Sequence, residues 1–166
     1  MVTQTNDQLE LAFNYLQYTN ENVFLTGKAG TGKTTFLHNL RKQSPKRMIV
    51  VAPTGVAAIN AGGVTIHSFF QISFGPQVPF DPNKPRPVEV ASDGSVAAGI
   101  KRFNRDKINI IRSLDLLVID EISMVRADLL DAVDEVLRRY KNRYKPFGGV
   151  QLLMIGDLQQ LAPVVK

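Results

Sequence analysis

Short runs made up almost entirely of apolar residues alternate along the chain with segments in which apolar residues recur every three or four positions. The runs have strand length and cover residues 23–26, 48–52, 116–119 and 150–155. Helical spacing is found from Leu9 to Leu16, over 34–42, over 56–61, and from Leu129 to Tyr140. Strands that are apolar throughout and alternate with helices are typical of a parallel sheet covered on both faces. The pattern therefore predicts an α/β fold.

Residues 74–99 do not follow this alternation. They contain five of the nine prolines in the chain, at positions 76, 79, 82, 85 and 87. We interpret the segment as an irregular insertion in a single domain over 1–166, because the pieces on either side of it need each other to complete a sheet. The chain stops just after a strand and a loop, which is an unusual place for a domain to finish. We therefore expect it to be part of a longer protein.

The amino-acid composition excludes several classes of protein. Hydrophobic residues make up 44% and charged residues 21% of the 166 positions, close to globular averages. The absence of cysteine excludes disulfides and thiolate metal sites, and two histidines cannot form a histidine cluster. No apolar run has the roughly 18–20 residues needed to cross a bilayer, and no secretory signal is visible. The net charge of +5 permits a polyanionic partner. We expect a cytoplasmic protein with no membrane partner.

A glycine-rich turn connects the first predicted strand to the next helix. Its sequence, GKAGTGKT over residues 27–34, fits the phosphate-loop pattern of Gly, four residues and Gly-Lys-Thr, in the required strand–helix context. Glycines let backbone amides face a phosphate, and the helix adds its positive end. We expect Lys33 to contact the β- and γ-phosphates of ATP and Thr34 to bind Mg²⁺. The predicted nucleotide contacts are Gly27, Lys28, Ala29, Gly30, Thr31, Gly32, Lys33, Thr34 and Thr35.

Two carboxylates, Asp120 and Glu121, directly follow the apolar run at 116–119. The carboxyl edge of a parallel sheet faces the ligand crevice. We expect Asp120 to hold Mg²⁺, and Glu121 to orient and deprotonate the attacking water, a role that only a hydrolase needs. Residues 152–157 (LLMIGD) show the same pattern on the next predicted strand, an apolar run followed by a carboxylate. A glutamine shortly after them would contact both the γ-phosphate and the water.

Four stretches together resemble the Pif-type DNA helicases, a family of helicase superfamily one that is related to the RecD helicases. They are similar, in order, to the family's motifs I, Ia, II and III: TGKAGTGKTT at 26–35, APTGVAAINAGGVTIHSF at 52–69, LVIDEISMV at 117–125 and PFGGVQLLMIGDLQQLAPV at 146–164. The resemblance implies a P-loop NTPase domain of the RecA-like type. It also implies a second RecA-like domain, with an arginine finger, C-terminal to residue 166.

The resemblance implies roles for single residues. It gives Lys33, Thr34, Asp120 and Glu121 the parts already expected, and Gln160 matches the motif III glutamine that senses the γ-phosphate. Gln8 matches the glutamine that reads adenine, with Gln4 as the poorer candidate. Thr54, Gly55, His67 and Phe69 fall in motif Ia, which lines the path of single-stranded DNA in the family. Leu158 and Ala162 replace residues usual for motif III, a change expected to loosen that loop.

Two basic runs have two interpretations. Residues 101–107 interleave cations with an aromatic residue, as single-strand grooves do, and Lys101 and Arg102 are the candidate DNA contacts there. Residues 138–145 hold five cations in eight positions. Each run is also compatible with a solvated helix end, which we favour for the second run. Similarly, His67 is either a DNA contact or a hydrogen-bonded structural histidine.

These observations predict an ATP hydrolase that drives translocation on single-stranded DNA and unwinding of duplex junctions in the intact protein. The resemblance implies movement in the 5′–3′ direction. Without the second domain we expect Mg-ATP to bind and to be hydrolysed poorly. The alternatives are a P-loop ATPase of another class, a kinase, and a nucleotide-dependent interaction module.

Overall fold

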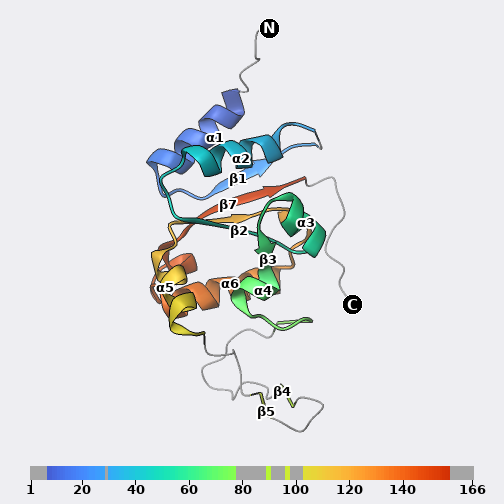
Figure 1. Ribbon diagram of the computed structural model, residues 1–166, viewed down its shortest axis with the longest axis vertical. Helices are drawn as coiled ribbons and strands as arrows, with labels where there is room; N and C mark the ends of the chain where they lie inside the picture. Colours follow the sequence, from blue (N-terminus) through green and yellow to red (C-terminus); the bar gives the residue numbers. More distant parts are fainter. Residues whose placement is uncertain (1–6, 29, 78–88, 91–95, 98–102, 158–166) are drawn as a thin grey trace.

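Five parallel strands form the central sheet of the computed structural model, which describes residues 7–28, 30–77, 89–90, 96–97 and 103–157. Their order across the sheet is β1-β7-β6-β2-β3 (Figure 1). A separate antiparallel pair is formed by β4 (Glu89–Val90) and β5 (Val96–Ala97). The sheet strands are β1 (Val23–Thr26), β2 (Met48–Ala52), β3 (Val64–Thr65), β6 (Leu116–Ile119) and β7 (Gln151–Gly156).

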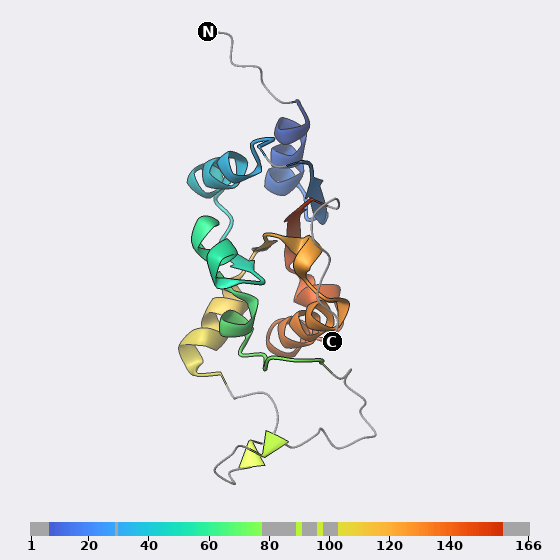
Figure 2. The ribbon, with the colours of Figure 1, turned by 90° about the vertical axis from the view of Figure 1, so that its right-hand side faces the viewer.

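Helices cover both faces of the sheet, which confirms the predicted α/β class. One face carries α1 (Asp7–Tyr18) and α2 (Lys33–Gln43), and the other carries α4 (Ile66–Phe70), α5 (Arg105–Ser113) and α6 (Ala127–Tyr140) (Figures 1 and 2). The short α3 (Gly55–Asn60) follows β2, and two 3₁₀ turns, η1 (Ile122–Met124) and η2 (Pro146–Gly149), precede α6 and β7. No helix among the described residues is long and apolar enough to span a membrane.

Strand β6 shows why a strand in the middle of this sheet is apolar at every position. Successive side chains of a strand point to opposite faces. Leu116 and Val118 accordingly join the core under α1 and α2, whereas Leu117 and Ile119 join the core under α4, α5 and α6. All four side chains are fully buried. The strand therefore has no solvent-facing side on which a polar residue would be favoured.

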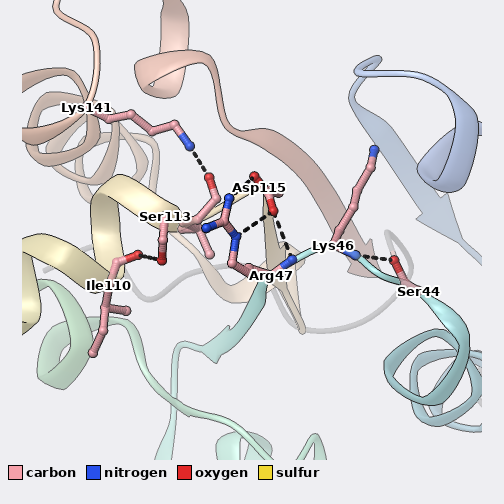
Figure 3. Close-up of polar contacts among 8 residues, drawn as sticks. Ser44, Lys46, Arg47, Ile110, Ser113, Asp115 and Lys141 are labelled. Atoms are coloured by element: carbon pink, nitrogen blue, oxygen red, sulfur yellow. Dashed lines mark hydrogen bonds and ion pairs between the residues drawn. The ribbon is translucent and has the colours of Figure 1, made fainter.

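Polar contacts join the starts of β2 and β6 at the amino edge of the sheet (Figure 3). The backbone nitrogen and Nε of Arg47 donate to Oδ2 of Asp115 at 3.1 and 3.0 Å. Lys141, just after α6, donates to the carbonyl of Leu114. Nearby, the buried Gln151 accepts from Nζ of Lys46 at 2.6 Å. These contacts fix the amino edge of the sheet.

Candidate functional site

A cleft of about 350 Å³ lies where the carboxyl ends of β1, β6 and β7 meet. Because β7 lies between β1 and β6, the loop after β1 and the residues after the other two strands share one crevice. The predicted phosphate-loop lysine, magnesium hydroxyl and acidic pair all line it. The lining residues are Gly30, Gly32, Lys33, Thr34, Thr35, Asp120, Glu121, Gly156 and Asp157.

The glycine-rich turn leads directly into α2. Gly32, at φ 89°, has the left-handed backbone that favours glycine and precedes the first helical residue, Lys33. The N-cap residue of α2 is Gly32, which has no side chain to cap the helix, so the first amide groups can face an anion. Nζ of Lys33 donates to the carbonyls of Gly27 and Lys28 at 2.5 and 2.8 Å. The ammonium group therefore lies over the same turn, in position for a phosphate.

The acidic pair is held by the end of β6 and by an unusual turn. The nitrogen of Asp120 donates to the carbonyl of Val51 at 2.9 Å, which keeps the strand in register beyond its last residue. Glu121 then adopts φ 53° and ψ 44°, and its nitrogen donates to Oδ1 of Asp120 at 3.0 Å. A non-glycine residue in this conformation costs on the order of 1–3 kcal/mol and is found preferentially at functional sites.

Burial changes the chemistry of both carboxyl groups. Burial raises the pKa of Asp120. Burial also raises the pKa of Glu121, and the negative charge of the neighbouring Asp120 raises it further. The positive charge of Lys33 opposes both shifts. Glu121 is therefore a stronger proton acceptor than an ordinary exposed glutamate.

Two residues of the cleft, Gly156 and Asp157, were not predicted as site residues. Asp157 is only 8% exposed and follows β7 as Asp120 follows β6. The repeated pattern of an apolar strand and a carboxylate was the signal in the sequence. A Cβ at Gly156 would lie 2.8 Å from Cγ2 of Ile122, so glycine allows η1 to pack against the end of β7. Ala29 and Gln160, also predicted for this site, lie outside the described residues.

The donor set in the cleft fits Mg²⁺. Thr34 offers a hydroxyl and Asp120 a carboxylate, both of which are the oxygen ligands that this ion prefers. In the part of the chain that the structure describes, no group of three or more His, Asp or Glu residues could hold a metal. The two protein oxygens would therefore act together with phosphate oxygens of a nucleotide, which is the usual arrangement for Mg²⁺.

The remaining predicted contacts lie around this cleft and beyond it. Gln8 is exposed in the first turn of α1, and Cδ1 of the adjacent Leu9 lies 3.6 Å from the Cβ position of Gly32. The start of α1 therefore borders the phosphate loop. Thr54 and Gly55 are exposed at the start of α3, where Oγ1 of Thr54 accepts from the nitrogen of Ala57 at 3.2 Å.

The prediction that Phe69 contacts DNA is wrong. Its side chain is 6% exposed and lies in the core, with Nζ of Lys107 3.5 Å above the ring centroid. The helical spacing of α4 turns both Phe69 and Phe70 inward, where their rings meet edge to face at 4.9 Å. His67 is half-buried and stacks on Phe74, and burial lowers the pKa of its imidazole.

The structure describes residues 103–107 of the first basic run and all of the second, residues 138–145. Lys101 and Arg102 lie outside the described residues. Phe103, in the same run, is 5% exposed and stacks on Tyr140 at 4.9 Å, so it is a core residue. In the second run, Arg138 forms an ion pair with Asp134 at 2.7 Å. This contact and the Lys141 bond to Leu114 favour a structural role for those two cations.

The comparisons with known proteins agree on one family. The sequence profile of the PIF1-like helicases matches residues 6–166. The ATP-dependent DNA helicase PIF1 of Candida albicans is 39% identical over 150 residues, covering 87% of this chain and 15% of the relative. The human helicase of the same name is 41% identical over 147 residues, covering 88% of this chain and 20% of the relative.

Solved structures show the same similarity. A crystal structure of Bacteroides Pif1 bound to single-stranded DNA has 47% identity and a TM-score of 0.81, over 100% of this chain and 34% of the other. Pif1 helicase from Bacteroides in complex with ADP-AlF3 and single-stranded DNA has 47% identity and a TM-score of 0.82 over the same shares. The RecA-like fold is confirmed. The chain spans only about a third of those proteins and a fifth or less of the two relatives.

Proposed function

This chain belongs to the PIF1-like helicase family, and from that membership we propose that it is part of the motor of an ATP-dependent DNA helicase. The observation that carries the proposal is the convergence of Lys33, Thr34, Asp120 and Glu121 on one cleft. A site that only holds a nucleotide needs the first three residues. The second carboxylate, on a strained turn beside the first, supports hydrolysis as well as binding.

Each residue of the cleft has a different role in the proposed hydrolysis of ATP. The amides of the phosphate loop and the Lys33 ammonium hold the triphosphate of ATP and offset its charge. Glu121 orients a water molecule in line with the γ-phosphorus and accepts its proton, for which the raised pKa suits it. Mg²⁺, held by Thr34 and Asp120, would neutralise charge on the β- and γ-phosphates when bound. Gln160 as the γ-phosphate sensor and Gln8 as the adenine contact remain predictions.

Single-stranded DNA and duplex junctions are the proposed partners. The exposed Thr54 and Gly55 and the half-buried His67 support a DNA path beside α3 and α4. Contacts to the phosphate backbone make such binding tolerant of sequence and steeply dependent on salt. Lys101 and Arg102 remain candidate contacts. The 5′–3′ direction and roles in DNA repair, recombination and telomere maintenance are further proposals from the family resemblance. The cytoplasmic location is a separate proposal, made from the sequence composition.

A second RecA-like domain is proposed to complete the site in the intact protein. An arginine finger contributes about 10³–10⁵ in rate where one is present. We therefore expect residues 1–166 alone to bind Mg-ATP but to hydrolyse it slowly and to unwind no DNA. Robust DNA-stimulated turnover by this portion would contradict the proposed need for a second domain.

The test of the proposed function is Glu121→Gln in the intact protein. This change keeps the size of the side chain and removes the proton acceptor. We expect unchanged ATP affinity together with loss of ATP hydrolysis and unwinding. Glu10→Gln, at an exposed position of α1, is the matched control and should behave as wild type. Unwinding by the Glu121 variant, or no turnover by the wild-type protein, would favour another class of P-loop ATPase or a nucleotide-dependent interaction module.

A further inference from the structure

Phe74 has the most exposed large apolar side chain in the part of the chain that the structure describes, at 87%. A single exposed apolar residue is common in proteins and by itself indicates nothing. Phe74 differs because both its ring and the loop that carries it are held in place. The contacts that hold them come from two separate helices, α4 and α6.

The ring of Phe74 stacks on His67, with centroids 4.5 Å apart and planes 20° from parallel. His67 belongs to α4, in which Ile66 and Phe70 are fully buried, so the core fixes the position of the imidazole. Nδ1 of His67 is buried and has no hydrogen-bond partner among the described residues. One face of the Phe74 ring is therefore supported by a flat, anchored side chain, and the other is open to solvent.

The loop after α4 is fixed by hydrogen bonds on both sides of Phe74. Nε2 of Gln77 donates to the carbonyls of Ser73 and Gly75 at 2.8 and 3.0 Å. The nitrogen of Gln77 donates to Oδ2 of Asp128 on α6 at 2.7 Å. Arg126 holds the same carboxylate through Nε and Nη2 at 2.9 and 3.0 Å. The loop is thus ordered before any ligand arrives, which lowers the entropy cost of binding.

We propose that the open face of Phe74 is a stacking platform for a base of single-stranded DNA. The inference rests on the proposed function and adds to it a contact that no sequence motif indicated. A rigid, planar aromatic surface backed by a second ring matches the shape of a nucleobase. Because every base has a π-face, such a contact is independent of sequence. It also lies on the loop that follows α4, the helix that carries the candidate DNA contact His67.

The test measures binding of the intact protein to two single strands of equal length by fluorescence anisotropy. One strand is oligo(dT), and the other is an abasic phosphodiester that keeps the charge and lacks the bases. Loss of one base–aromatic stack weakens affinity by about 5- to 150-fold. We expect Phe74→Ala to lose that much on oligo(dT) and less than about twofold on the abasic strand, and Phe74→Tyr to restore binding. Tyr18→Ala, at a 79% exposed aromatic on α1, is the matched control and should leave both affinities unchanged.

The outcomes separate this inference from the proposed function. If wild-type protein binds oligo(dT) and Phe74→Ala binds it equally well, the platform is overturned while the helicase proposal stands. A protein partner for Phe74 would give that result. If Phe74→Ala weakens binding equally on both strands, the role is structural and stacking is overturned. If the wild-type protein binds neither strand, the proposed function fails and this inference fails with it.

Discussion

Replacing Gly156 with alanine tests how tightly η1 packs against the end of β7 in the cleft. The new Cβ would lie 2.8 Å from Cγ2 of Ile122 and 3.3 Å from the backbone nitrogen of Ser123. The isoleucine side chain can turn away, but the backbone nitrogen belongs to η1 and can move only with that turn. Overpacking a well-packed site costs about 1–3 kcal/mol. We therefore expect urea denaturation to give a free energy of unfolding lower by about 1–3 kcal/mol.

The same displacement has a consequence for catalysis, because η1 begins immediately after Glu121. Misplacement of a reacting group by about 1 Å can lower a rate about 10²-fold. We expect Gly156→Ala in the intact protein to lose about 10- to 100-fold in ATP hydrolysis and much less in Mg-ATP affinity.

Gly55→Ala is the matched control for the stability measurement. A Cβ at Gly55 meets no atom within 4 Å, and alanine is favoured over glycine in a helix such as α3. This variant should be as stable as the wild-type protein or slightly more stable. The packing argument is refuted if Gly156→Ala keeps wild-type stability, or if Gly55→Ala is destabilised to the same extent.

Three other predictions concern the rest of the fold. Gln151 is 2% exposed and forms hydrogen bonds with Lys46 and with the carbonyl of Glu21. Because Gln151→Leu removes these bonds, it should lower the free energy of unfolding by about 1–3 kcal/mol in urea denaturation. An unchanged free energy of unfolding would contradict this. Arg47 holds the pKa of Asp115 below its usual range, so the ion pair stabilises the protein above about pH 4 and loses its effect as pH falls through the lowered pKa. Both side chains are partly exposed, so Asp115→Asn should destabilise the protein only slightly at pH 7, and a Tm difference from wild type that does not shrink as the pH falls below about 4 would contradict the assignment. Leu117→Ala, at a fully buried position, should cost about 2–5 kcal/mol, whereas Leu11→Ala, at a 50% exposed position, should cost far less.

The parts of the fold that could be predicted from the sequence are those that local pattern determines. The strand at 116–119 is buried on both faces, so its apolar run is unbroken and marks the sheet without other information. The phosphate loop and the acidic pair depend on short, contiguous residue patterns. Their meeting in one cleft follows from the carboxyl edge of a parallel sheet.

The features that were missed depend on contacts between distant segments. Helix α5 is only 9 residues long and buries only Ile111 fully, so it offers few apolar positions from which a helix could be predicted. Ile66, Phe69 and Phe70 lie at helical spacing, but the inward position of Phe69 also depends on how α4 docks on the core. Glu121, with its left-handed backbone, directly precedes η1. The position of η1 depends on its packing against Gly156, which belongs to another strand, β7. Phe74 is ordered through Gln77 and Asp128, which are far apart in the chain.

The most direct test of the central claim is a crystal structure of the protein with Mg²⁺ and a non-hydrolysable ATP analogue. We expect the β- and γ-phosphates to lie against the glycine-rich turn and Lys33, with Thr34 and Asp120 beside the ion and Glu121 facing the γ-phosphate. Density for the analogue at another place on the surface, or Glu121 turned away from a bound γ-phosphate, would contradict the assignment of this cleft.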